Sequence, residues 1–277
     1  MREIDVSHLG RERVICCWQV ADVLVDPGPE STLSTLMDAI EDRAPRALLL
    51  THIHLDHAGG TGALVRAFPD LKVYVHEAGA SHLIDPSKLM RSASRLYGED
   101  NMERLWGEMV PVPEQNVHVL EGGETVEGFR VAHAPGHASH HVAYLHEDSG
   151  WAFTGDVAGV RIGRDLPVVP PTPPPDIDVD AWFASIDRVA AWDPAALALT
   201  HFGAYDDVDR HLDALREALR RQAEWARDLD EQAFLQRRRE WVAGAPAIYE
   251  QAAPSEQMWL GLERYWRKKA EEESEAA

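Results

Sequence analysis

A dense group of metal-binding side-chain types stands at residues 52–57 of this chain. The segment Thr51-His52-Ile53-His54-Leu55-Asp56-His57 holds three imidazoles and one carboxylate within six positions. Imidazole nitrogen suits zinc and iron, and a carboxylate adds a hard oxygen ligand. Because the cluster follows the apolar residues 47–50, we expect it at the end of a buried strand. The segment therefore predicts a metal site.

Three residues further along the chain have the chemistry to complete such a site. His137 follows a Pro-Gly bend, whereas Asp156 and His201 each come shortly after an apolar run. Open α/β sheets place their sites beyond the carboxyl ends of strands, so these side chains are expected to meet the first cluster. His52 and His54 are two positions apart and should point the same way in an extended chain. One group of ligands could then serve one ion and the other group a second.

The surrounding sequence predicts a sheet-based fold with helices between the strands. Short apolar runs predict strands at 23–25, 47–50, 73–75, 117–120, 129–133, 141–145, 151–153 and 197–199, and helices at about 31–41, 61–68 and 179–192. The β-α-β order around the His cluster implies parallel strands there. Six prolines between positions 167 and 175 predict a rigid extended loop, because proline suits neither a helix interior nor a central strand.

Two segments fall outside this alternation of strands and helices. Residues 77–110 are mostly polar with scattered large apolar side chains, and we expect them to form an inserted helical segment. Residues 1–205 are expected to form the catalytic domain, and residues 206–277 a C-terminal helical extension. Leu212, Leu215 and Leu219 mark an apolar stripe in that extension. Such a face should pack on the core or form a homodimer interface.

Charge and cysteine content narrow the range of partners. The formal charge of −20 disfavours a nucleic acid or an anionic membrane, because phosphate contacts need clustered Lys and Arg. Cys16 and Cys17 are adjacent in an apolar run, which predicts buried reduced thiols and fits a reducing compartment. The chain begins with no apolar signal core, and no stretch approaches the ~20 apolar residues of a membrane span. We therefore expect a cytoplasmic protein that acts on a small molecule.

The ordered set of candidate ligands resembles the metallo-β-lactamase superfamily, whose signature is His-x-His-x-Asp-His. The resemblance covers about residues 10–205 and implies an α/β fold, the αββα sandwich, here with inserted helices and a C-terminal helical extension. It also implies two divalent metal ions, with zinc as the leading choice and iron or manganese as alternatives. The family pattern assigns His52, His54 and His137 to the first ion, Asp56, His57 and His201 to the second, and Asp156 to both as a bridge.

The resemblance also implies a metal-dependent hydrolase in which a bridging hydroxide attacks a small ester-like substrate. Common β-lactamases of the family carry a cysteine where this chain has Asp156, which favours the glyoxalase II-like and lactonase-like branches. A thioester or a lactone is then the expected substrate. Asp56 is expected to orient the attacking water, and Tyr205 is a candidate for contacting the substrate oxyanion. The alternatives are a mononuclear iron persulfide dioxygenase and, third, a non-catalytic sensing module.

Three other features have a structural interpretation as well as a functional one. His140 and His141 are expected to pack beside the ligands rather than to bind metal. Tyr205 also fits a half-buried packing position at the start of a helix. The run Arg237-Arg238-Arg239 is compatible with binding an anionic carrier, but a solvated helix face is the commoner explanation.

Overall fold

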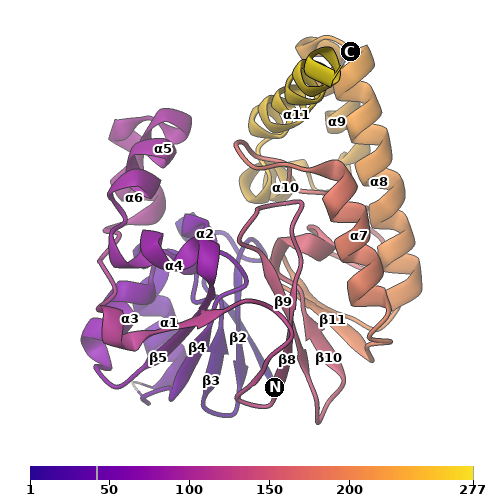
Figure 1. Ribbon diagram of the computed structural model, residues 1–277. Coiled ribbons are helices and arrows are strands. Elements are labelled where there is room, and N and C mark those ends of the chain that lie inside the picture. Colours follow the sequence, from indigo (N-terminus) through magenta and orange to yellow (C-terminus); the bar gives the residue numbers. More distant parts are fainter. Residues whose placement is uncertain (42, 277) are drawn as a thin grey trace.

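Two six-stranded sheets pack face to face, and helices cover the outer face of each sheet (Figure 1). The structure is a computed structural model and describes residues 1–41 and 43–276. The strand order is β1-β2-β3-β4-β5-β6 in the first sheet and β12-β11-β10-β9-β8-β7 in the second. This arrangement confirms the predicted αββα sandwich.

The first sheet has a parallel half, and that half leads to the His cluster. Strands β3 to β6 run parallel, while β1 and β2 are antiparallel to their neighbours. Strand β4 is wholly apolar and wholly buried, as expected of a parallel strand that is covered on both faces. The strands are β1 (Arg2–Asp5), β2 (Cys16–Val20), β3 (Val23–Val25), β4 (Ala47–Leu49), β5 (Lys72–His76) and β6 (Val117–Leu120).

Short helices cover or extend the first sheet. They are α1 (Leu33–Ile40), α2 (Leu55–Ala58), α3 (Thr61–Ala67) and α4 (Glu77–Ile84), with 3-10 turns η1 (His8–Gly10), η2 (Glu30–Thr32) and η3 (Glu114–Asn116). Helices α5 (Ser87–Tyr97) and α6 (Glu99–Trp106) follow α4, so the segment predicted as inserted helices is helical. In Figure 1, α5 and α6 rise above the sheets on the side opposite α10 and α11.

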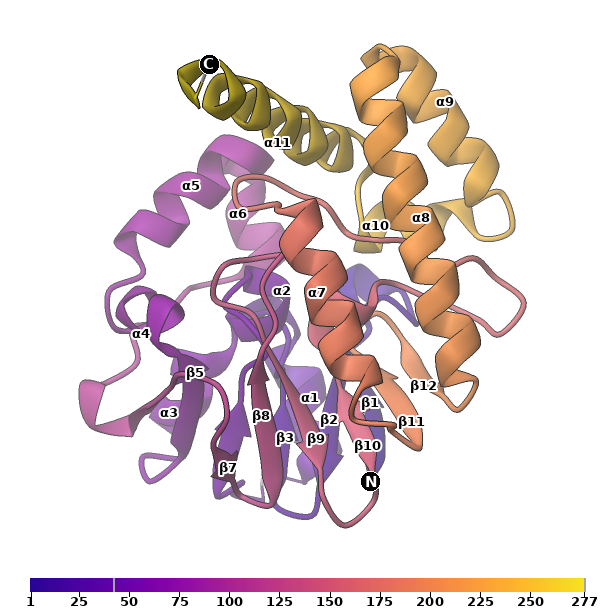
Figure 2. The same cartoon turned by 45° about the vertical axis from the view of Figure 1, so that its right-hand side comes forward.

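The second sheet is mostly antiparallel, and only β10 and β11 run parallel. Helices α7 (Val179–Ala190) and α8 (Val208–Asp228) cover its outer face (Figure 2). Asp178 begins α7 by accepting a hydrogen bond from the backbone N–H of Ala181. The strands are β7 (Thr125–Val126), β8 (Phe129–His133), β9 (Val142–His146), β10 (Trp151–Phe153), β11 (Ala196–Leu199) and β12 (Gly203–Tyr205), with the 3-10 turn η4 (Gly155–Ala158) after β10.

Strand β12 differs from the sequence prediction. Tyr205 was expected near the start of a helix, but it ends a strand that pairs antiparallel with β11. Gly203 has a φ of +87°, a conformation that glycine adopts without strain, and it begins the returning strand. The chain therefore turns back along the sheet before α8 begins.

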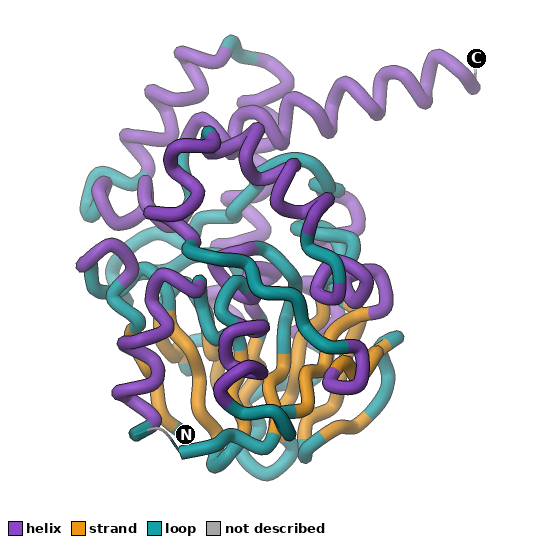
Figure 3. The backbone as a smooth tube through the Cα atoms, turned by 90° about the vertical axis from the view of Figure 1, so that its left-hand side faces the viewer, coloured by secondary structure: helices purple, strands orange, loops and turns teal. Residues whose placement is uncertain are grey.

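The C-terminal helices pack on the second sheet and on each other. Leu212, Leu215 and Leu219 of α8 are buried in one core cluster with Leu197 and Leu199 of β11. Helices α9 (Glu231–Trp241), α10 (Pro246–Ala252) and α11 (Ser255–Ala276) follow, and the last part of α11 projects beyond the body of the protein (Figure 3). A homodimer through these helices stays a prediction.

Cys16 and Cys17 are buried free thiols in β2, as predicted from their apolar setting. In residues 1–41 and 43–276, no helix combines the length and the apolar character needed to cross a bilayer.

Candidate metal centre

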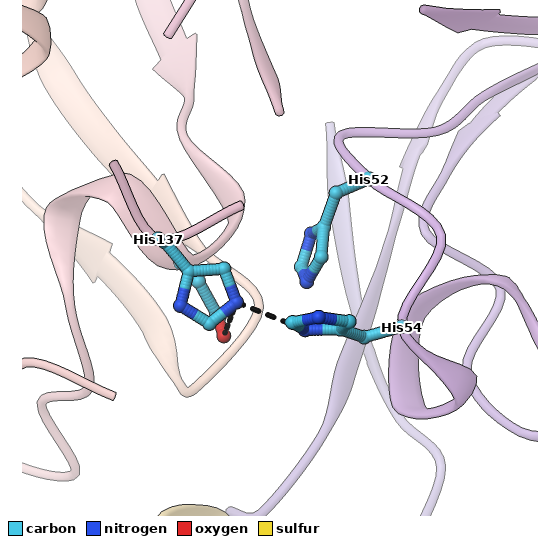
Figure 4. A group of neighbouring side chains, drawn as sticks. His52, His54 and His137 are labelled. Carbon is cyan, nitrogen blue, oxygen red and sulfur yellow. Dashed lines mark hydrogen bonds and ion pairs between the residues drawn. The ribbon is translucent and has the colours of Figure 1, made fainter. Parts of the chain in front are cut away.

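The carboxyl ends of several strands bring the candidate ligands to one place. His52 and His54 follow β4, and helix α2 then carries Asp56 and His57. The other three come from the second sheet: His137 from the β8–β9 connection, Asp156 from η4 after β10, and His201 after β11. In Figure 4 the rings of His52, His54 and His137 converge from the two sides of the sandwich. The sequence prediction that all seven side chains meet thus agrees with the structure.

The seven side chains form two adjacent groups. His52, His54, His137 and Asp156 each offer a ligand atom, and these atoms lie within 4.8 Å of one another. Asp56, His57 and His201 do the same in the second group. This is the division that the family resemblance implied, apart from the dual assignment of Asp156.

The carboxylate of Asp156 faces both groups. Its Oδ2 lies 3.3 Å from Nε2 of His137, in the first group. Its Oδ1 lies 3.3 Å from Nε2 of His57 and 3.5 Å from Nε2 of His201, in the second group. A carboxylate in this position has one oxygen available for each of two cations.

Hydrogen bonds on the far side of the rings fix which nitrogen faces the centre. Nδ1 of His57 donates to Asp26 at 2.8 Å, Nδ1 of His201 to the Val14 carbonyl at 2.6 Å, and Nδ1 of His137 to the Pro171 carbonyl at 2.8 Å. These partners only accept, so each Nδ1 carries hydrogen. In the neutral ring the lone pair is then on Nε2, which points into the centre.

Several polar atoms at the centre are buried without a hydrogen-bond partner among the described residues. They are Nε2 of His52, Nε2 of His57, Nε2 of His201 and Oδ1 of Asp156. Leaving such atoms unsatisfied costs about 1–3 kcal/mol each. Lone pairs on imidazole and carboxylate are the donors that a divalent transition metal ion takes, so these residues fit a metal site.

The two groups differ in how readily their histidines bind a proton. Burial, together with neighbouring imidazoles, lowers the pKa of His52 well below its usual value and that of His54 to about 3. Burial also opposes charge on His57, but the nearby carboxylates outweigh it and raise the pKa of His57 well above its usual value. Asp156 likewise outweighs burial and raises the pKa of His201. A cation in the second group must therefore displace protons that the first group scarcely binds.

Asp26 holds the second group in place, although it was not among the predicted site residues. This buried carboxylate accepts hydrogen bonds from Nδ1 of His57, from the backbone N–H and hydroxyl of Thr51, and from the hydroxyl of Thr200. It therefore joins the segments that follow β3, β4 and β11. A signal for this role was present, because Asp26 directly follows a buried strand just as other site residues do.

His141 also acts from behind the ligands. Its Nε2 accepts a hydrogen bond from the backbone N–H of Asp156 at 3.2 Å, which agrees with the predicted packing role. His140 lies at the wall of a cavity beside His54.

Two cavities open at the metal centre. The smaller, of about 290 Å³, touches His54, Asp56 and Asp156, and its walls include η1, α6, α10 and the start of α11. The larger, of about 490 Å³, lies between α5 and the proline-rich loop. His54, Tyr97 and Pro173 line both cavities, so these side chains mark where the two meet.

Tyr205 is placed away from both cavities. Its ring is buried, the guanidinium of Arg161 lies 4.2 Å from the ring centroid, and its hydroxyl donates to the Arg161 carbonyl at 2.6 Å. The Tyr205 hydroxyl is thus hydrogen-bonded to the backbone, and it does not lie with the candidate ligands. The tyrosine that lines the cavities is Tyr97, at the end of α5, which sequence reasoning did not select.

Comparison with known proteins agrees with this site. Residues 21–201 match the family model of the Metallo-beta-lactamase superfamily, and the chain belongs to that superfamily. It is an enzyme of the metallo-hydrolase type. All seven candidate ligands lie within the matched residues.

Several curated proteins are similar to this chain. The Metallo-beta-lactamase fold-containing protein ST1585 of Sulfurisphaera tokodaii is 29% identical over 199 residues, which cover 68% of this chain and 71% of that protein. A hydroxyacylglutathione hydrolase of Legionella pneumophila is 30% identical over 141 residues, which cover 50% of this chain. The match spans only 44% of that hydrolase's length.

Solved structures share the fold. The structure of ST1585 has a TM-score of 0.66 at 22% identity and covers 89% of this chain and 97% of that one. TTHA1623, whose structure is described as a di-iron-bound form, is 30% identical with a TM-score of 0.54, and the comparison covers 73% of this chain and 93% of that one.

Proposed function

We propose that this protein is a hydrolase that holds two divalent ions and cleaves a small carbonyl ester, with a thioester or a lactone as substrate. The observation that carries the proposal is the position of Asp156, which presents one carboxylate oxygen to each ligand group at 3.3 Å. The second group of Asp56, His57 and His201 offers the donors for a second ion beside the first.

The first ion would be held by His52, His54 and His137, the second by Asp56, His57 and His201, with Asp156 shared. Two such ions would lower the pKa of a bound water and would polarise the carbonyl under attack. Five imidazoles and two carboxylates suit zinc or iron, and we propose zinc. Because the structure of TTHA1623 is described as a di-iron-bound form, iron is the alternative to test against zinc.

The chain's own residues supply orientation and a partly dry site. Asp56 lines the smaller cavity and lies 3.4 Å from Nε2 of His201, so its carboxylate can accept a hydrogen bond from a water at the centre. Apolar side chains of the same cavity, including Leu105, Trp106 and Met258, limit the water that reaches the carbonyl. Tyr97 lines both cavities where they meet, so it lies along the path of a substrate that extends from one cavity to the other.

The choice of a thioester or lactone rests on the relatives and on the donor set. The Legionella relative is named as a hydroxyacylglutathione hydrolase, and the position that holds cysteine in common β-lactamases holds Asp156 here. The larger cavity gives room for a leaving group of some length beside the reacting carbonyl.

The test is elemental analysis of the purified protein together with a substrate panel. The panel contains thioesters, lactones, phosphodiesters and β-lactams, each assayed with the zinc-loaded, iron-loaded and chelator-treated protein. We expect about two ions per chain and hydrolysis of a thioester or lactone that chelation abolishes. One tightly bound iron with oxygen uptake on a persulfide would instead support the dioxygenase.

A further inference from the structure

The larger cavity has a basic wall that the proposed chemistry does not use. Helix α5 contributes Lys88, Ser92 and Arg95 to the lining. These residues are four and three positions apart, so they lie on one face of the helix with Ser92 in the middle. Lys88 and Arg95 are about 10 Å apart along the helix axis, a span that two long, flexible side chains can close around one group beside Ser92.

Both cations lack a carboxylate partner within the part of the chain that the structure describes. None of its Lys or Arg ion pairs includes Lys88 or Arg95. Among the described lining residues, Asp176 is the one carboxylate, and its Oδ2 already accepts a hydrogen bond from Ser139 at 2.8 Å. The ring nitrogens of His82 and His140 add possible donors to the same cavity.

This wall is basic in a protein that is acidic as a whole, with 47 acidic and 27 basic residues. Lys88 and Arg95 each lack an ion pair with a carboxylate among the described residues. Two cations without such a partner, on one face of a helix, beside a cavity that reaches His54, are instead available to a bound anion.

We propose that Lys88, Ser92 and Arg95 form a subsite for an anionic group at the end of the substrate remote from the reacting carbonyl. This inference rests on the proposed function, and it narrows the substrate to an ester or thioester whose far end bears a carboxylate or a phosphate. The carbonyl would lie at the metal centre, and the anionic end would extend past Tyr97 into the larger cavity. The cations pair with the anion, and the Ser92 hydroxyl donates a hydrogen bond to it.

Arg238, the central residue of the run Arg237-Arg238-Arg239, does not contribute to an anion subsite. Arg238 is buried, where its guanidinium donates to Gln222, to Ser255 and to the Ala253 carbonyl. It therefore joins helices of the C-terminal extension, and the solvated helix face expected from the sequence is wrong for this residue.

The experiment compares three thioesters that share one acyl group and one thiol skeleton. The far end of the thiol bears a carboxylate, a phosphate or a neutral amide. The metal-loaded wild-type protein is compared with the double variant Lys88→Glu/Arg95→Glu and with Arg91→Glu. Arg91 is exposed on the same helix but does not line the cavity, so it controls for a change of charge.

We expect the double variant to lower kcat/KM for the anionic thioesters, relative to the neutral one, by about tenfold, the size that two partly exposed ion pairs allow. The loss should shrink at high salt, because exposed charges are screened. Arg91→Glu should change the ratio of kcat/KM between the anionic and the neutral thioesters by less than about twofold. A larger loss on phosphate than on carboxylate, or the reverse, identifies the anion. Equal losses on anionic and neutral thioesters, or the same ratio change in Arg91→Glu, would overturn the subsite.

A binding measurement separates this inference from the proposed reaction. The thioether analogue of each compound cannot be hydrolysed, and calorimetry gives its affinity for the wild-type protein and both variants. If no thioester or lactone is cleaved but the anionic thioether binds the wild type more tightly than the double variant, the subsite stands and the proposed reaction fails. If thioesters are cleaved and the thioether affinities do not depend on Lys88 and Arg95, the subsite fails and the reaction stands. Unchanged thermal unfolding midpoints verify that each variant is folded.

Discussion

His57 donates a hydrogen bond from Nδ1 to the carboxylate of Asp26 across 2.8 Å, and both side chains are completely buried. This bond turns the Nε2 lone pair of His57 toward Asp156. The same carboxylate accepts from Thr51 and Thr200, so one acidic side chain fixes the orientation of a candidate ligand and the ends of neighbouring strands.

Replacing Asp26 by alanine should therefore affect both stability and metal content. Four donors would lose their acceptor inside the protein, so we expect the free energy of unfolding to fall by about 3 kcal/mol. The ion of the second group should bind more weakly by about 10–100-fold, because His57 is no longer held. Chemical unfolding and metal titration measure the two effects. Asp22→Ala, an exposed carboxylate just before the same strand, is the control, and equal effects in both variants would contradict this role.

Asp156→Ala should be more damaging than the loss of any single histidine ligand. Because the carboxylate faces both groups, we expect the bound metal to fall from about two ions to less than one, with hydrolysis reduced by more than about a hundredfold. Elemental analysis and the hydrolysis assay measure both. Asp148→Ala, in the exposed turn between β9 and β10, should keep metal and activity. Near wild-type activity in Asp156→Ala would show that the bridge is misassigned.

Acidification should remove the two ions in sequence. Metal binding requires a neutral imidazole. The pKa values of His57 and His201 are raised by their carboxylate neighbours against the effect of burial, so protons compete for the second group at higher pH. Burial lowers the pKa of His54 to about 3, so the first group stays neutral to lower pH. As the pH falls, the ion of the second group should leave first.

Metal content after dialysis at a series of pH values checks this order. The wild type should lose its ions in two steps. Asp56→Asn weakens metal binding by the second group only. This variant should retain the metal-loss step at lower pH and lose much of the step at higher pH. A single step in the wild type, or loss of the low-pH step in Asp56→Asn, would be inconsistent with two groups of different proton affinity.

Tyr205→Phe should reduce stability more than catalysis. The lost hydroxyl donates to the backbone carbonyl of Arg161, so we expect a destabilisation of about 1 kcal/mol and a change in kcat below about twofold. Thermal unfolding and steady-state kinetics give the two numbers, and Tyr74→Phe on strand β5, which removes a partly buried hydroxyl that donates to Glu127, is the control. A large fall in kcat without loss of stability would restore the predicted contact between Tyr205 and the substrate.

The sequence was informative where chemistry and local pattern coincide. His52, His54, Asp56 and His57 could be predicted because they are neighbours in the chain and follow an apolar strand. The strands and helices around them appear within a residue or two of the predicted positions, because alternating burial and turn residues are local signals.

The remaining parts of the site depend on contacts between distant segments. The role of Asp26 depends on its contacts with the segments that follow β4 and β11, which come together only in the folded protein. Tyr97 lines the cavities only because α5 lies against the proline-rich loop. Strand β12 was missed because three residues carry too short a pattern to distinguish a strand from the start of a helix.

The smaller cavity is closed by segments from both ends of the chain. His8 of η1 stacks on Trp106 of α6, and its backbone carbonyl accepts a hydrogen bond from Gln251 of α10 at 2.8 Å. All of the candidate ligands lie in residues 21–201, but His8 and the wall at 250–258 lie outside that range. The reactive centre and the wall that screens it can therefore diverge independently among relatives. A chimera that keeps this centre and takes both terminal segments from another member of the superfamily would be a direct route to a changed choice of substrate.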